Sequence, residues 1–126
     1  MTTKTSLQSA IKTAVQLLRL SSDAESGGVI LRKGDVYQFI PCVNESTTPT
    51  CIYSPIMDTV FQMINDDPEW VMYASVHNHP YWSSNPSRID QEELFQSFPK
   101  NYIYSNLSNT LAEYDINSTV HYVNKV

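Results

Sequence analysis

The N-terminal segment of the chain carries a helical pattern of apolar positions. Ser6 precedes the segment and is a residue type that commonly caps the N-terminus of a helix. Between residues 7 and 20 the apolar side chains fall on one face of a helix, and they are Leu7, Ala10, Ile11, Ala14, Val15 and Leu18. The pattern predicts an amphipathic helix over residues 7–20 that packs a single stripe of side chains against a core.

The next segment alternates between strand-like runs and turn residues. Two runs rich in β-branched and aromatic residues, 27–31 and 36–40, are separated by Arg32-Lys33-Gly34-Asp35. Turn residues between two such runs are typical of a β-hairpin. A further short strand is expected at residues 51–53, because Cys51-Ile52-Tyr53 is apolar and lies between polar stretches.

A second helix is expected directly after that strand. Ser54 matches the preference for the N-cap position and Pro55 the preference for the first helical position. Apolar residues continue with helical spacing to Ile64. The acidic stretch Asp66-Asp67-Pro68 is then expected to end the helix, because proline cannot continue it.

The run 70–76 is almost entirely apolar, as in a strand that is covered on both faces, and we expect it to be central in the sheet. A Pro-, Ser- and Asn-rich loop follows, then a third helix over residues 88–98. Three more short strands are predicted, at residues 102–104, 111–114 and 119–123. The order of elements indicates an α/β or α+β fold with one mixed sheet, flanked by about three helices, in a single domain of residues 1–126.

Composition and charge exclude several classes of function. The 8 basic and 13 acidic residues give a net charge of −5, and no basic run offers a face that would neutralise phosphates, so nucleic-acid binding is not expected. The longest apolar runs fall well short of the roughly 20 residues that span a membrane. We therefore expect a soluble, unexported, cytoplasmic protein. Cys42 and Cys51 lack the spacing of a metal motif and are expected to be buried thiols.

The candidate chemistry lies at the end of the predicted central strand. His77 and His79 are two positions apart, so both side chains point to the same face of a strand. Asp90 falls in the first turn of the following helix, where it can fold back over the strand end. A catalytic zinc ion takes three protein ligands and one water in a tetrahedron. The three side chains therefore form a candidate zinc site.

Hydrolysis at such a site also needs a group that moves a proton. Glu25 stands at the entry to the predicted strand 27–31, and the small residues that follow it allow a close backbone approach to a metal. Ser87 could donate a hydrogen bond to the oxyanion that develops on the attacked carbonyl. We take Glu25 as the candidate general acid/base and Ser87 as the candidate oxyanion donor.

Structural interpretations of the same residues remain open at this stage. Ser87 and Asp90 fit the S-x-x-[DE] pattern of a capping box, which a helix start would explain without any metal. An isolated pair of histidines is more often incidental than functional, and a lone acid such as Glu25 is more often a surface charge. His121 has no partner at a metal-ligand spacing and is expected to be structural.

The complete pattern resembles a known family. The chain reads HNHP, six residues, then SRID, which is similar to the HxHP, six residues, SxxD signature of the JAMM (MPN+) metalloproteases, also called the JAB domain family. Glu25-Ser26-Gly27-Gly28 matches the family's E-x-x-G element. The resemblance implies a cytidine-deaminase-like α/β architecture, Zn2+ bound by His77, His79 and Asp90, catalysis by Glu25 and Ser87, and hydrolysis of a peptide or isopeptide bond.

Two further stretches refine this resemblance. Pro41-Cys42-Val43-Asn44 resembles bacterial and phage members, including the N-terminal domain of the phage lambda tail-assembly protein K. Tyr81 and Trp82 follow the HNHP motif where the related RadC group usually has small residues. This aromatic pair could form a wall for an extended peptide substrate, or could simply pack against the loop.

The resemblance implies a zinc metallopeptidase in phage or prophage tail assembly, in the host cytoplasm or the virion tail, with tail proteins as partners. Two alternatives remain. One is a structural or assembly subunit of a tail tip that cleaves nothing. The other is a desampylase-like enzyme that removes a ubiquitin-like modifier by the same chemistry.

Overall fold

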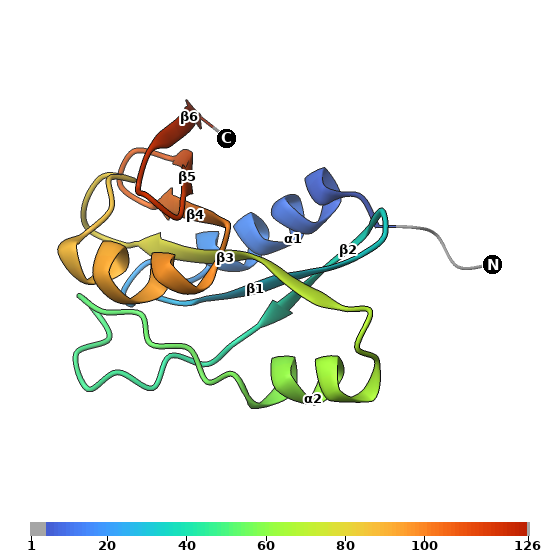
Figure 1. Cartoon of the computed structure of the whole chain (residues 1–126). Helices are drawn as coiled ribbons and strands as arrows, with labels where there is room; N and C mark the ends of the chain where they lie inside the picture. The colour runs from blue at the N-terminus through green and yellow to red at the C-terminus, as the bar shows by residue number, and fades with distance from the viewer. Residues whose placement is uncertain (1–4, 126) are drawn as a thin grey trace.

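The computed structural model describes residues 5–125, which form one mixed sheet with helices on both faces (Figure 1). The sheet has the strand order β2-β1-β3-β4-β5-β6, with β3 and β4 parallel and all other neighbours antiparallel. In chain order the elements are α1 (Leu7–Arg19), β1 (Gly27–Lys33), β2 (Val36–Pro41), α2 (Asp58–Asp66), β3 (Val71–His79), a third helical segment of π geometry (Asp90–Leu94) and 3-10 geometry (Phe95–Ser97), β4 (Lys100–Ser105), β5 (Thr110–Asp115) and β6 (Val120–Lys125).

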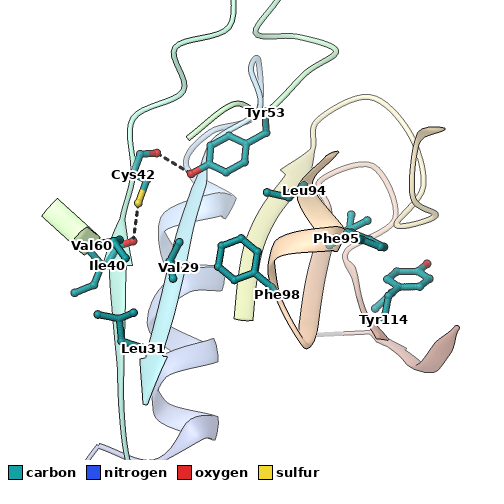
Figure 2. Close-up of a cluster of buried hydrophobic side chains, with 12 residues drawn as sticks. Val29, Leu31, Ile40, Cys42, Tyr53, Val60, Leu94, Phe95, Phe98 and Tyr114 are labelled. Carbon is teal, nitrogen blue, oxygen red and sulfur yellow. Dashed lines mark hydrogen bonds between the residues drawn. The ribbon is translucent and has the colours of Figure 1, made fainter. Parts of the chain in front are cut away.

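Alternation along the strands divides the core into two layers. On one face of the sheet, α1 packs on Ile30, Ala74 and Val76. On the other face, α2 and the third helical segment cover a second cluster. Figure 2 shows its side chains, which come from β1, β2, the loop after β2, α2, the third helical segment and β5: Val29, Leu31, Ile40, Cys42, Tyr53, Val60, Leu94, Phe95, Phe98 and Tyr114. A side chain of β3 therefore faces either α1 or the third helical segment, depending on its position in the strand.

The α/β class and the single mixed sheet are confirmed. The first helix begins after Ser6, whose Oγ accepts a hydrogen bond from the backbone N–H of Ser9. The hairpin of β1 and β2 turns at Gly34, which has a φ of 61° that favours glycine. The apolar run after Trp70 forms β3, which lies inside the sheet between β1 and β4, and the three C-terminal strands form as predicted.

Two predictions for the segment between β2 and α2 are wrong. Residues 51–53 form no strand, and α2 begins at Asp58, three residues later than the predicted start at Pro55. The side chain of Asn44 explains both differences, because its Nδ2 donates to the carbonyl of Ile52 and its Oδ1 accepts from the backbone N–H of Ser54. These bonds hold the segment in an extended loop, and Ser54 does not cap the helix.

The expectation of two buried thiols is half wrong. Cys42 is buried beside β2, but Cys51 is exposed, and the two cysteines form no disulfide. The exposure of Cys51 follows from the loop, which carries it outward where a strand would have carried it into the sheet. No helix within residues 5–125 is both long enough and apolar enough to cross a membrane.

Candidate metal centre

The C-terminal end of β3 carries both histidines on the face covered by the third helical segment. His77 and His79 are fully buried, and their rings lie edge to face with centroids 5.1 Å apart. Next to them, β1 approaches so closely that a Cβ atom on Gly27 would lie 1.9 Å from the carbonyl oxygen of Val76. Only glycine fits at this point, and the close approach brings the segment before β1, with Glu25, to the histidines.

The start of the third helical segment supplies a carboxylate. The backbone N–H of Asp90 donates to Ser87 Oγ at 3.0 Å, and the backbone N–H of Ser87 donates to Asp90 Oδ2 at 2.9 Å. This reciprocal pair is the predicted capping box. It fixes the Asp90 side chain with Oδ1 at 3.1 Å from His77 Nε2 and Oδ2 at 3.1 Å from His79 Nε2. Capping and ligand placement are therefore compatible roles of the same two residues.

Glu25 completes a group of four buried side chains. One potential ligand atom from each of Glu25, His77, His79 and Asp90 lies within 4.8 Å of all the others. Glu25 Oε1 is 3.8 Å from His77 Nε2, farther than either Asp90 oxygen lies from its histidine. In a tetrahedral site with zinc at about 2.0–2.1 Å from its ligands, neighbouring ligand atoms are about 3.3 Å apart. The shorter distances favour Asp90 as the ligand and leave Glu25 next to it.

The donor atoms themselves fit a zinc ion. Glu25 Oε1 and both ring nitrogens of His77 are buried with no hydrogen-bond partner. Buried polar atoms without partners are rare and costly, and a cation that accepts the lone pair of His77 Nε2 would remove that cost for this nitrogen. His79 Nδ1 lies 2.8 Å from the carbonyl oxygen of Ser83, an arrangement that leaves Nε2 free to ligate. Two imidazoles and a carboxylate form a ligand set that zinc accepts, with room for a water.

Burial and opposing charges set the protonation of the group. Burial raises the pKa of Glu25 from 4.5 to about 7, because the attraction of His77 and His79 only partly offsets the loss of solvation. Burial alone would raise the pKa of Asp90 and lower that of His77. Their mutual attraction reverses both effects, so the pKa of Asp90 is held well below its ordinary value and that of His77 is raised. Asp90 is therefore anionic and Glu25 is readily protonated.

Three residues that shape the site were missed by sequence reasoning. The ring of Tyr53 stacks on His77 with centroids 5.7 Å apart, and its hydroxyl donates to the carbonyl of Cys42. Asn44 Nδ2 donates to the carbonyl of Glu25, and Asn78 contacts the segment around Glu25. The position of Asn78 between the two histidines indicates that it lies near the site. No residue close to Tyr53 in the sequence indicates that its ring stacks on His77.

The aromatic pair after the histidines lies at the surface. Tyr81 is 51% exposed and Trp82 is 42% exposed, and their rings are arranged edge to face with centroids 6.3 Å apart. The Tyr81 hydroxyl donates to the carbonyl of Asp23, close in sequence to Glu25. The exposure of both rings leaves them free to contact another molecule.

Comparison with solved structures relates this fold to known proteins. AF2198, a JAB1/MPN domain protein from Archaeoglobus fulgidus, is 14% identical with a TM-score of 0.62, covering 100% of this chain and 99% of that one. A structure described as JAMM, a metalloprotease-like zinc site in the proteasome and signalosome, is 15% identical with a TM-score of 0.60 over 100% and 99% of the two chains. The fold is that of the JAB1/MPN domain.

The solution structure of DSY2949 from Desulfitobacterium hafniense is also similar, at 20% identity and a TM-score of 0.59 over 98% of this chain and 88% of that one. No family model and no curated protein matches the sequence. The JAB1/MPN fold therefore rests on three-dimensional similarity at low identity. Within that fold, this chain carries a buried group of two histidines and two acids that could hold a metal ion.

Proposed function

We propose that this protein is a zinc-dependent metallopeptidase that hydrolyses a peptide or isopeptide bond. The observation that carries the proposal is the buried group of Glu25, His77, His79 and Asp90, with ligand atoms within 4.8 Å of one another and two atoms that face the group, Glu25 Oε1 and His77 Nε2, without hydrogen-bond partners. Similarity to structures described as JAB1/MPN and JAMM proteins supports it at the level of fold.

His77, His79 and Asp90 would hold the zinc ion, and Glu25 lies beside them. When bound, zinc polarises a carbonyl group and lowers the pKa of a coordinated water to about 7. Glu25 then accepts the proton of the attacking water and donates it to the nitrogen of the breaking C–N bond. Burial raises the pKa of Glu25 to about 7 in the metal-free group, and the positive charge of a bound zinc ion would lower it, which favours the ionised form that accepts the proton of the water. Ser87 Oγ accepts a hydrogen bond from the backbone N–H of Asp90, which leaves the hydroxyl proton of Ser87 free. That proton would be donated to the carbonyl oxygen of the substrate as negative charge develops on it.

An apolar groove beside the site favours a polypeptide substrate. The groove has a volume of about 240 Å3 and runs between the loop before α2 and the third helical segment, with Asp90 in its lining. Phe61 and Ile89 also line it and are 56% and 38% exposed. A groove of this character accepts an apolar side chain next to the scissile bond, and Tyr81 and Trp82 would contact the chain elsewhere.

We further propose that the biological substrate is a phage tail protein. The resemblance of the Pro41–Asn44 stretch to bacterial and phage proteins, among them the lambda tail-assembly protein K, supports processing of phage tail proteins. Removal of a ubiquitin-like modifier would use the same chemistry on an isopeptide bond. A structural tail subunit that cleaves nothing is the non-enzymatic alternative, and the complete set of catalytic side chains disfavours it.

The test is incubation of zinc-loaded protein with a peptide library that contains backbone and lysine isopeptide bonds, with new termini detected by mass spectrometry. Wild type should cleave, preferentially beside apolar residues, and chelation should abolish cleavage. Glu25→Gln should lose at least about 100-fold in rate while keeping one bound zinc. Glu92→Gln, an exposed acid on the third helical segment, is the matched control and should retain full activity. Cleavage that persists in Glu25→Gln would overturn the mechanism, and absence of bound zinc would overturn the proposal.

A further inference from the structure

We propose that Asn78 is a positioning residue that holds Glu25 at the metal centre by bonding the peptide groups on both sides of it. This inference rests on the proposed function, since it concerns the geometry of the proposed general base. Asn78 lies between the two histidines in β3, but alternation turns its side chain to the opposite face of the sheet. There it is completely buried.

The Asn78 amide makes a full set of hydrogen bonds. Its Oδ1 accepts from the backbone N–H of Ser26 at 2.6 Å. The two N–H groups of its Nδ2 face three acceptors, the carbonyl oxygens of Ser21 at 2.7 Å and Ala24 at 3.2 Å and Asn106 Oδ1 at 2.7 Å, so one N–H is shared between two of them. The backbone N–H of Asn78 also donates to the carbonyl of Ser26 at 3.1 Å. One residue thus joins the segment before β1, the strand of the histidines and the end of β4.

Glu25 lies between two of these contacts. The carbonyl of Ala24 and the N–H of Ser26 belong to the peptide groups directly before and after Glu25, and Asn78 bonds both. The segment 20–26 has no regular secondary structure, so its position depends on such individual bonds. Asn78 therefore ties the backbone of the base to the strand that carries the histidines, while the N–H of Glu25 donates to the carbonyl of Pro49 and its carbonyl accepts from Asn44 Nδ2.

No other side chain of this size offers the same bonds. The site needs one acceptor toward Ser26 and donors toward the carbonyls of Ser21 and Ala24, which only an amide provides. Aspartate would place a second acceptor against two carbonyl oxygens. Serine is shorter and has a single donor, so it would loosen the segment without introducing a charge. Misplacement of a catalytic group by about 1 Å reduces the rate by about 100-fold.

The test compares Asn78→Ser with Asn101→Ser in the zinc-loaded protein. Asn101 is the matched control, because it is also completely buried and also bonds a side chain and a backbone carbonyl, those of Ser75 and Phe98, but does not contact the Glu25 segment. The measurements are amide hydrogen exchange at Ser26 by NMR, zinc affinity by chelator competition, and kcat and KM on the best peptide of the library.

Asn78→Ser should accelerate exchange of the Ser26 amide and lower kcat by about 10- to 100-fold, with KM and zinc affinity within about threefold of wild type. Asn101→Ser should change none of these beyond about threefold. In a Glu25→Asp background, where the base is already displaced, Asn78→Ser should reduce kcat less than in wild type. If Asn78→Ser does not fold, Asn106→Ser, which removes an acceptor of the same amide, should show the same changes at smaller size.

Unchanged exchange at Ser26, equal losses of kcat in the wild-type and Glu25→Asp backgrounds, or the same pattern in Asn101→Ser would overturn the positioning role. These failures are distinct from failure of the proposed function. The proposed function fails if Glu25→Gln remains active or no zinc binds, whatever Asn78 does. The exchange of the Ser26 amide also reports on Asn78 without any catalytic turnover.

Discussion

At the scale of single residues, Glu25 has the least ordinary environment in the site. It is an acid with 3% of its surface exposed, and its Oε1 has no hydrogen-bond partner. Burial disfavours its charged form, and the neighbouring histidines only partly compensate, so its pKa lies near 7. In the metal-free protein this carboxyl group therefore exchanges its proton near neutral pH, and a bound cation would favour its ionised form.

The same burial predicts how the stability of the metal-free protein depends on pH. The pKa of Glu25 is about 7 in the folded state and 4.5 when exposed, so the folded state binds the proton more tightly. Its contribution to the free energy of unfolding is therefore complete below about pH 4.5 and is lost as the pH rises to about 7. Relative to Glu25→Gln, wild type should lose about 3 kcal/mol over this range. Urea unfolding of both proteins in the presence of a chelator measures this loss. A stability of wild type relative to Glu25→Gln that stays constant or increases with pH would contradict the prediction.

The site could be predicted from sequence only where a residue's role follows from its spacing. His77 and His79 share a face of one strand, and Asp90 is placed by the start of the next helix, so their convergence follows from local rules. Tyr53 could not be predicted, because its stacking on His77 depends on a loop whose path is set by bonds of Asn44 to distant residues.

At the scale of elements, the third helical segment is important because its first turn carries Asp90, the proposed metal ligand. The capping box ties Asp90 to Ser87, and apolar side chains such as Leu94 and Phe95 anchor the segment in the core (Figure 2). The segment is helical over residues 88–97, close to the predicted 88–98, but its central part has π geometry. Such geometry is uncommon and occurs often at functional sites.

Removal of the cap should therefore have two separable effects. Ser87→Ala should destabilise the protein by about 1 kcal/mol, the usual effect of losing an N-cap. It should also weaken zinc binding by about 10- to 100-fold, because Asp90 loses the partner that orients it. Ser6→Ala is the matched control, since Ser6 makes the same cap bond at α1, far from the metal centre in the chain, and should lower stability only. Chemical unfolding and zinc competition separate the effects, and Ser87→Thr should restore both. Equal zinc affinity in the two alanine variants would show that the cap does not position the ligand.

Elements with a strong repeating pattern were predictable, and the loop between β2 and α2 was not. The helix after Ser6 and the hairpin around Gly34 follow from periodicity and turn residues that act locally. Ser54 and Pro55 satisfy the local preferences for a helix start, yet Pro55 pairs with Asn44 in an isolated bridge. Tertiary hydrogen bonds outweighed the local preference at this point.

At the scale of the whole molecule, the candidate metal centre joins parts of the chain that the sheet alone leaves separate. The segment before β1, the end of β3 and the third helical segment meet at one buried group of polar side chains. Without a cation, two carboxyl groups and two imidazoles are confined together, which is unfavourable unless they are neutralised or paired. A bound metal ion would connect these segments directly, so metal binding and global stability should be coupled.

Zinc should therefore stabilise the whole fold. At a free zinc concentration of 100 times the Kd, the free energy of unfolding should rise by about 2.7 kcal/mol. Thermal or urea unfolding with zinc, and then with excess chelator, measures the change. Magnesium should have little effect, because it prefers oxygen ligands in octahedral geometry. Asp90→Asn should abolish the response to zinc, and a variant response equal to that of wild type would exclude Asp90 as a ligand.

The most direct test is a crystal structure of the zinc-loaded protein with anomalous diffraction data recorded on both sides of the zinc absorption edge. A single strong anomalous peak should lie about 2.0–2.2 Å from one nitrogen of each of His77 and His79 and from one carboxylate oxygen of Asp90, with Glu25 adjacent but not coordinated. No peak among these side chains, or a zinc ion ligated by Glu25 in place of Asp90, would contradict the proposed site.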